Sequence, residues 1–289
     1  MINDKIRSLD SWDIYITPKR QWFDLNLYEI IKYKDLLWIF VKRDITSVYK
    51  QTILGPLWFM IQPLISTIIF YLIFNKVARI PTDDIPPSLF YMSGIIAWNY
   101  FSSCLLNTSK TFLSNSSIFG KVYFPRIIVP LSTVISGLMK LVIQLLLFVG
   151  LCFYFIYVGN NHINPSMKTI LIFPVLIIQM ALLGQGIGMI ISSFTVKYRD
   201  LNYIVSFGTQ LMMYLSPIIY PLSSVPEKYK LFILMNPMTA IIEGFRQVLL
   251  GKGILDFYMF TFSFLFSLFT FFLGLLVFNK FEKNFIDTI

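Results

Sequence analysis

Apolar and charged residues alternate along residues 27–50 with the period of an α-helix. At 100° per residue, one side of this helix collects the apolar positions Leu27, Ile30, Ile31, Leu37, Trp38, Val41, Ile45 and Val48. The other side collects Lys32, Asp35, Lys42, Arg43, Thr46 and Lys50. This pattern is typical of a helix that lies in the plane of a membrane surface, and we expect it within a cytoplasmic arm of residues 1–52.

The next stretch, residues 53–74, holds no charged residue. As a helix with a rise of 1.5 Å per residue it would cross a hydrocarbon core of roughly 30 Å. Gly55 and Pro56 stand at the junction, where proline can begin a helix but cannot continue one unbroken. The sequence therefore predicts a surface helix that bends directly into a spanning helix.

Five more apolar segments follow, separated by polar turns. They predict an all-α membrane protein with six transmembrane helices, an N-terminal amphipathic interfacial helix, and re-entrant helices between the fifth and sixth spans. The six spans are expected at about 53–74, 88–108, 127–158, 169–194, 201–215 and 254–278. The transmembrane domain would then cover residues 53–278, and residues 279–289 would form a cytoplasmic tail.

The re-entrant region, residues 222–253, is too hydrophobic for a free loop but is broken by prolines and glycines. Two short half-inserted helices, at about 228–235 and 237–249, would satisfy both observations. Such backbone is stable at membrane depth only where protein or water lines it. We therefore expect this region to pack against the spanning helices.

Composition and charge support a membrane protein with several spans. Of the 289 residues 56% are hydrophobic and 13% are charged, about half the charged share of an average globular chain. The net charge of +9 does not indicate nucleic-acid binding, because most Lys and Arg residues lie between apolar runs, where they orient a protein in the bilayer. With the N-terminus cytoplasmic, that side collects sixteen Lys and Arg residues against seven on the other. Both termini are therefore expected in the cytoplasm.

Catalytic and metal-binding patterns are missing from the sequence. No GxxxxGK[ST] motif occurs, since Gly120 and Lys121 lack its glycine-rich lead, so an ATPase would have to reside on another chain. A Ser-His-Asp set and a clustered acidic pair within a span are also missing, which gives little support to an intramembrane enzyme. Cys104 and Cys152 lie in apolar runs, and His162 is the single histidine. We expect no metal and no cofactor bound by this chain.

A few polar and small residues inside apolar segments have two interpretations. Lys140, near the centre of the third segment, either fixes helix packing through a hydrogen bond or contacts a substrate. Glu243 and Arg246 are three residues apart and can pair with one another. The run from Gly184 to Gly188 offers the small-xxx-small surface of closely packed helices, which is a structural feature.

Two basic loops and a set of aromatic residues are candidates for contacts. Residues 118–126 combine aromatic rings with two cations, and residues 197–200 form a second basic turn. Each is either an interfacial anchor or a docking site for a soluble partner. Aromatic side chains beside the helix breaks are candidates for a transport pathway, where rings stack on sugars. With Lys140, the pathway candidates are Trp58, Tyr203, Phe207, Tyr214 and Tyr220.

An ordered set of motifs resembles one family. Residues 49–58 read Tyr-Lys-Gln-Thr-Ile-Leu-Gly-Pro-Leu-Trp and are followed by Gln62-Pro63. This stretch, where the chain enters the first expected span, resembles the corresponding stretch of ABC-2 type permeases that export polysaccharides. That group includes O-antigen, capsule and teichoic acid exporters. The likeness continues through Phe124-Pro-Arg126, Lys197-Tyr-Arg-Asp200, Ser216-Pro217, Tyr220-Pro221 and Asn236-Pro237. It covers essentially the whole chain in the family's order.

The resemblance implies a transmembrane subunit in the cytoplasmic (inner) membrane, not an enzyme. Such permeases act as homodimers with two copies of a separate cytoplasmic ABC ATPase, which binds ATP and Mg. They export an undecaprenyl-diphosphate-linked glycan. The first and fifth segments would border the conduit at the dimer axis, and the helices between the fifth and sixth segments would form its outer gate.

The resemblance also implies site residues. Contacts that couple the chain to the ATPase would involve Lys42, Arg43, Gly120, Lys121, Tyr123, Phe124, Pro125 and Arg126. Arg43, Lys50 and Arg126 would contact the lipid diphosphate, although the same cations also suit anchoring to anionic membrane lipid. Two alternatives stay open at this point: a drug or lipid exporter of the same fold, and a membrane enzyme acting on lipid-linked sugars.

Overall fold

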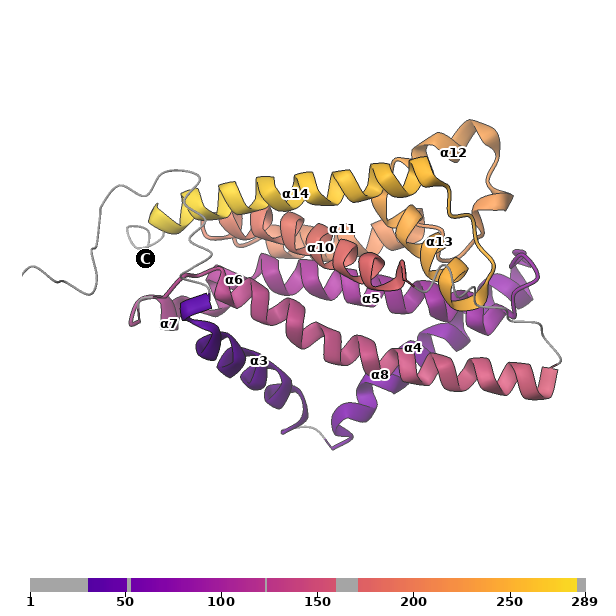
Figure 1. Ribbon diagram of the computed structural model, residues 1–289, viewed down its shortest axis with the longest axis horizontal. Coiled ribbons are helices and arrows are strands. Elements are labelled where there is room, and N and C mark those ends of the chain that lie inside the picture. Colours follow the sequence, from indigo (N-terminus) through magenta and orange to yellow (C-terminus); the bar gives the residue numbers. More distant parts are fainter. Residues whose placement is uncertain (1–30, 51–52, 123, 160–170, 285–289) are drawn as a thin grey trace, which may run out of the picture.

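The computed structural model describes residues 31–50, 53–122, 124–159 and 171–284, and its regular structure in these ranges is entirely helical. The predicted all-α class is therefore confirmed. Most of the expected N-terminal arm, Tyr123, the loop with His162 and the last five residues lie outside the described ranges. In Figure 1 the long helices run roughly side by side along the horizontal axis. We call the end with α3 (Lys34–Tyr49), α6 (Thr111–Ser114) and α7 (Ser116–Phe119) the α3 end, and the opposite end, with α12 (Glu227–Leu234), the α12 end.

Five of the described helical segments are long and apolar enough to cross a membrane. Their bounds are Gly55–Val77, Pro87–Ser109, Ile128–Val158, Phe173–Thr195 and Phe257–Phe281. They lie where five of the six spans are expected. The expected fifth span corresponds to α11 (Leu201–Leu215), whose 15 residues extend only about 22 Å. This helix is shorter than a hydrocarbon core, so the six-span count stays a prediction.

Helix α5 (Pro87–Ser109) forms the centre of the bundle, and α10 (Phe173–Thr195) packs between it and α14 (Phe257–Asn284). The glycines of α10 permit this close approach. A Cβ built on Gly184 would lie 2.8 Å from the carbonyl oxygen of Phe101 on α5. A Cβ built on Gly186 would lie 2.6 Å from the backbone nitrogen of Phe271 on α14. The structural interpretation of the glycine run is confirmed, because both neighbouring helices contact α10 through backbone atoms.

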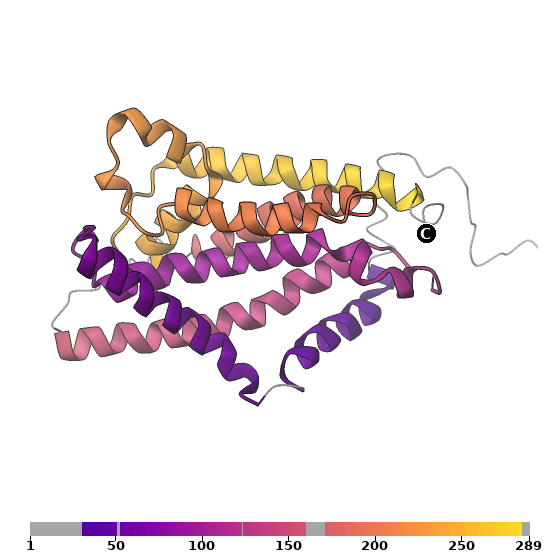
Figure 2. The same cartoon turned by 180° about the vertical axis from the view of Figure 1, so that it is seen from behind.

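Helix α3 (Lys34–Tyr49) ends near η1 (Gly55–Leu57), and α4 (Trp58–Phe70) leads away from there at an angle to α3, which both views show (Figures 1 and 2). Helix α3 packs against α8 (Ile128–Gly159), with Phe40 and Val41 buried. Trp38, expected on the same apolar side, is 62% exposed because α8 covers only part of that side. A short turn, η1 (Gly55–Leu57), starts α4, and a π-helical turn, η2 (Tyr71–Val77), ends it.

The α12 end carries the elements that follow α11. The chain is extended at Ser216, passes through η3 (Leu222–Ser224), and forms α12 (Glu227–Leu234) and α13 (Pro237–Leu250). The side chain of Asn236 caps α13 by accepting the backbone N–H of Met238 at 3.0 Å. Most of α13 is buried, whereas α12 buries none of its residues. Two helices thus occupy the region expected to be re-entrant, and their depth in a membrane stays a prediction.

The loop between η2 and α5 also lies at the α12 end. Asp83 and Asp84 adopt left-handed backbone conformations, with φ of 49° and 56°. The hydroxyl of Ser223 in η3 donates to both carboxylate oxygens of Asp83 at 2.7 and 2.8 Å. The ammonium of Lys252 donates to the carbonyl of Asp84 at 2.9 Å. These bonds hold the η2–α5 loop against the segments that flank α12 and α13.

Candidate functional site

A cavity of about 370 Å³ opens at the α3 end, between α3, the start of α4, the end of α5 and α8. Its lining combines polar and charged side chains with the ring of Phe59 and a few apolar groups. The charged members are Arg43, Asp44, Lys110 and Lys140, contributed by α3, the α5–α6 junction and α8. Segments distant in sequence therefore place three cations and one carboxylate around one space.

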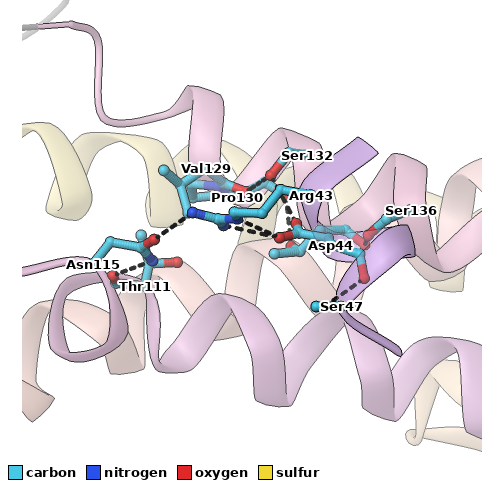
Figure 3. Close-up of polar contacts among 10 residues, drawn as sticks. Arg43, Asp44, Ser47, Thr111, Asn115, Val129, Pro130, Ser132 and Ser136 are labelled. Atoms are coloured by element: carbon cyan, nitrogen blue, oxygen red, sulfur yellow. Dashed lines mark hydrogen bonds and ion pairs between the residues drawn. The ribbon is translucent and has the colours of Figure 1, made fainter. Parts of the chain in front are cut away.

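Arg43 is the best-connected of these residues (Figure 3). Its Nε and Nη2 atoms donate to Oδ1 of Asp44 at 3.0 and 2.8 Å. Its Nη1 atom donates to Oδ1 of Asn115, which directly precedes the short helix α7 (Ser116–Phe119), at 3.4 Å. Its guanidinium also lies 4.5 Å from the ring centre of Phe40. The side chain therefore joins α3 to the α6–α7 segment as well as lining the cavity.

Lys140 reaches the same cavity from α8. Its ammonium lies 5.2 Å from the ring centre of Phe59 on α4, which is within the range of a cation–π contact. Lys140 thus joins α8 to α4 and also lines a polar space, and a contact with substrate stays a prediction. Lys110, exposed at the end of α5, adds a third positive charge. Such a set attracts an anionic group and can hold it through several charge-assisted hydrogen bonds.

The residues expected to couple the chain to an ATPase fall into two groups. Lys42, Gly120 and Lys121 are exposed at the α3 end. Phe124, Pro125 and Arg126 are buried, and Tyr123 lies outside the described residues. Burial follows from an aromatic cluster in which the ring of Phe124 lies 5.6 Å from those of Phe40 and Phe119. The loop 118–126 thus packs the rings of Phe119 and Phe124 inward and exposes Gly120 and Lys121.

The expected diphosphate contacts are not gathered at one point of the described structure. Arg43 lines the cavity, whereas Lys50 and Arg126 are not among its lining residues. Lys50 is exposed just after the end of α3. Arg126 is 6% exposed, and its guanidinium lies 5.4 Å from the ring centre of Phe119. Lys110 and Lys140 instead accompany Arg43, and the assignment of a diphosphate contact stays a prediction.

The aromatic pathway candidates lie mostly on the outside of the single chain. Trp58 of α4 and Tyr203, Phe207 and Tyr214 of α11 are exposed. Tyr220, after the end of α11, donates its hydroxyl to the carbonyl of Leu215 at 3.1 Å. Partial burial raises the pKa of Tyr220, so this phenol stays a hydrogen-bond donor at neutral pH. Helices α4 and α11 both lie on the face turned to the viewer in Figure 2.

Asp44, Asn115 and Lys110 are among the cavity residues that the sequence pattern did not single out. Asp44 follows Arg43 directly, and adjacent residues of a helix do not face one another, so spacing does not indicate a pair. Asn115 and Lys110 lie in a polar loop that has no periodicity. A signal was available only in the concentration of Asn, Ser and Thr between the second and third spans, which is unusual for a plain turn.

Comparison with known proteins identifies the family. The family model for ABC-2 type transporters matches residues 35–250, three quarters of the chain. The chain belongs to the ABC-2 type transporter family. Its matched part begins in α3 and ends with α13, so it includes both the cavity and the segments at the α12 end.

Named relatives of this ABC-2 protein are export and transport proteins. An O-antigen export system permease protein, RfbA of Klebsiella pneumoniae, is 29% identical over 255 residues, which cover 88% of this chain and 95% of the relative. RfbA of Myxococcus xanthus is 26% identical over 76% of this chain and 82% of its own length. The polysialic acid transport protein KpsM of Escherichia coli is 24% identical over 83% of this chain and 91% of its own length.

Proposed function

We propose that this ABC-2 protein is the membrane subunit of an exporter that moves an undecaprenyl-diphosphate-linked polysaccharide, of O-antigen, capsule or teichoic acid type, across the cytoplasmic membrane. The observation that carries the proposal is the cavity in which Arg43, Lys110 and Lys140 come together. A diphosphate on a lipid carries concentrated negative charge at the membrane surface, which suits this set. The names of the relatives, which speak of O-antigen export and polysialic acid transport, support the polysaccharide part of the substrate.

Energy would come from a separate ABC ATPase in two copies, with ATP and Mg bound on that partner. The exposed residues Lys42, Gly120 and Lys121 at the α3 end are the proposed contacts. They lie close to the cavity in the chain's own geometry, since Arg43 bonds to Asn115 at the start of α7. Through this bond, a headgroup bound by Arg43 would be connected directly to the loop that the ATPase would contact.

A second copy of the chain would complete the conduit. Helices α4 and α11 expose apolar and aromatic side chains on one face, and a glycan needs a wider path than one chain encloses. The short α11 would act as the sixth span within this dimer, with α12 and α13 as the outer gate. The α3 end, where the described chain begins and where α14 ends, would face the cytoplasm, in agreement with the excess of Lys and Arg on that side.

Reconstitution with the ATPase partner tests this function. The glycan lipid should stimulate ATP hydrolysis in a saturable manner, and Arg43→Gln should reduce the apparent affinity about tenfold. Lys32→Gln, which removes an exposed cation just before α3 that does not line the cavity, is the matched control and should behave like the unaltered protein. Stimulation by small amphiphiles instead of the glycan lipid would favour a drug or lipid exporter. Turnover of lipid-linked sugars without the ATPase would favour an enzyme.

A further inference from the structure

The pairing of Arg43 with Asp44 is unusual for neighbours on a helix. Adjacent side chains leave α3 about 100° apart, so the two charges do not face one another without a bend in the longer side chain. The arginine nevertheless reaches back and places both Nε and Nη2 on one carboxylate oxygen, Oδ1. The side chains of Arg43 and Asp44 are 41% and 21% exposed. An ion pair with this exposure contributes little to stability, so its presence calls for another role.

Asp44 is held in place from its other side. Its Oδ2 atom lies 3.2 Å from the hydroxyl of Ser132, which is buried on α8 and shares its one proton between this carboxylate and the carbonyl of Val129 at 2.9 Å. The carboxylate is therefore fixed between α8 and Arg43 at the wall of the cavity (Figure 3). Lys110 and Lys140 also line this cavity, where Asp44 is the single acidic residue among the lining side chains.

The edge of the guanidinium that Asp44 covers is the one that phosphates prefer. Nε and Nη2 form a planar fork that fits two oxygens of a phosphate or carboxylate. A diphosphate entering the cavity would therefore compete with Asp44 for the same two donors. We propose that Asp44 is an internal competing anion, which holds Arg43 while the cavity is empty and yields it to the diphosphate of the substrate. This inference rests on the proposed function.

Competition of this kind sets how tightly the substrate is held. An exporter must release its cargo, and a carboxylate anchored by Ser132 retakes Arg43 when the diphosphate leaves. Removal of the negative charge leaves Arg43 without its competitor. The substrate should then bind more tightly and leave more slowly. Asp44 is a positioning residue in this account, because it acts through Arg43 and not on the substrate.

Binding of undecaprenyl diphosphate without a glycan tests the inference. The permease–ATPase complex is placed in nanodiscs of neutral phosphatidylcholine, and its affinity for the lipid is measured with and without inorganic diphosphate as a competitor. Asp44→Asn should tighten binding about threefold to tenfold, while maximal stimulated ATP hydrolysis falls. Asparagine retains an oxygen for Ser132, so the fold is preserved. Asp35→Asn, which removes one negative charge from the exposed first turn of α3, is the matched control and should leave binding unchanged.

The double variant separates the possible outcomes. If Asp44 acts through Arg43, Asp44→Asn should have no effect on affinity once Arg43→Gln is present. Weaker binding in Arg43→Gln with unchanged binding in Asp44→Asn would overturn the inference and leave the proposed function standing. Complete lack of binding by the unaltered complex would overturn both. Competition by inorganic diphosphate at equal strength would show that the site recognises the diphosphate alone, whereas weak competition would show that the lipid contributes.

Discussion

Arg246 is among the largest side chains that the described chain buries completely. Its Nη1 atom donates to Oε1 of Glu243 at 2.8 Å, and its Nη2 atom donates to the carbonyl of Ile218 at 3.3 Å. The guanidinium lies 3.6 Å from the ring centre of Phe90 on α5. Glu243 in turn accepts the backbone N–H of Ile254 at 3.2 Å. The pair expected from the spacing of Glu243 and Arg246 is confirmed, and it joins α13 to three other segments.

Removing one member of this buried pair should be costly. Arg246→Met leaves the Glu243 carboxylate without its buried counter-ion, so we expect a loss of about 3–5 kcal/mol in the free energy of unfolding. The double variant Arg246→Met with Glu243→Leu should lose less, because neither charge is then buried. Equilibrium unfolding in mixed detergent micelles measures the free energy of unfolding of both variants. A single variant as stable as the unaltered protein would contradict the assignment of a stabilising junction.

At the scale of elements, α10 is held by contacts that leave no room for side chains. The carbonyl of Gly186 lies against Gly274 of α14, and a Cβ on either residue would overlap backbone atoms of the other helix. Backbone atoms cannot move aside as the end of a flexible side chain can. The spacing of α10 and α14 therefore depends on glycine at both positions.

Gly186→Ala should therefore push α10 and α14 further apart. We expect a loss of about 1–3 kcal/mol from overpacking, with a lower yield of folded protein in detergent. Gly150→Ala is the matched control, because a Cβ at Gly150 on α8 meets no atom within 4 Å. That variant should be as stable as the unaltered protein or slightly more stable, since alanine favours helix. Equal melting temperatures for the two variants would refute the packing argument.

The loop between α7 and α8 gives a second test at this scale. Lys121 is exposed, so Lys121→Glu should reduce substrate-stimulated ATP hydrolysis by the complex without a change in thermal stability. Arg126 is buried beside Phe119, so Arg126→Glu should reduce both quantities. Stimulation and melting temperature are measured on the same preparations. Full coupling in Lys121→Glu would remove this loop tip from the proposed ATPase contact.

At the scale of the whole molecule, α4 and α11 form one of the apolar faces that the single chain leaves exposed. Ile68 and Leu72 of the first span and Phe207 and Leu211 of α11 are exposed on it. Helix α5 contacts both α4 and α11. In a membrane, lipid or protein can cover such a face, and the proposed homodimer commits to a second copy.

Cross-linking distinguishes a face that is covered by lipid from a face that is covered by a second copy of the chain. In a chain whose own cysteines, Cys104 and Cys152, are replaced by alanine, Phe207→Cys should form a covalent dimer with a short thiol cross-linker in membranes. Phe269→Cys on α14 is the matched control, since Phe269 is equally apolar and similarly exposed, at 62% against 63%. It should stay monomeric. Equal yields of dimer from both positions would indicate random collision and would count against α11 as the dimer contact.

The hydropathy pattern, the helix caps and the helix-breaking residues along the chain were sufficient to predict the long helices. Five apolar runs, the amphipathic stretch before them and the breaks at Ser216, Pro226 and Gly251 predicted where helices begin and end to within a few residues. These signals are local, because a helix needs only its own backbone bonds and an apolar surface over about 20 residues. The same local signals could not show that Phe124 and Arg126 turn inward, since their burial depends on rings supplied by α3 and α7.

The sequence by itself determined the class of this protein: a helical membrane protein of the ABC-2 type without a nucleotide-binding motif of its own. Only the tertiary structure decided which charges share a space. Arg43, Lys110 and Lys140 are separated by tens of residues and lie on three segments, so their meeting depends on how α3, α5 and α8 pack. Apolar surface drives a segment into the membrane whatever its neighbours are, whereas a binding site exists only where distant segments bring side chains within a few ångströms of one another.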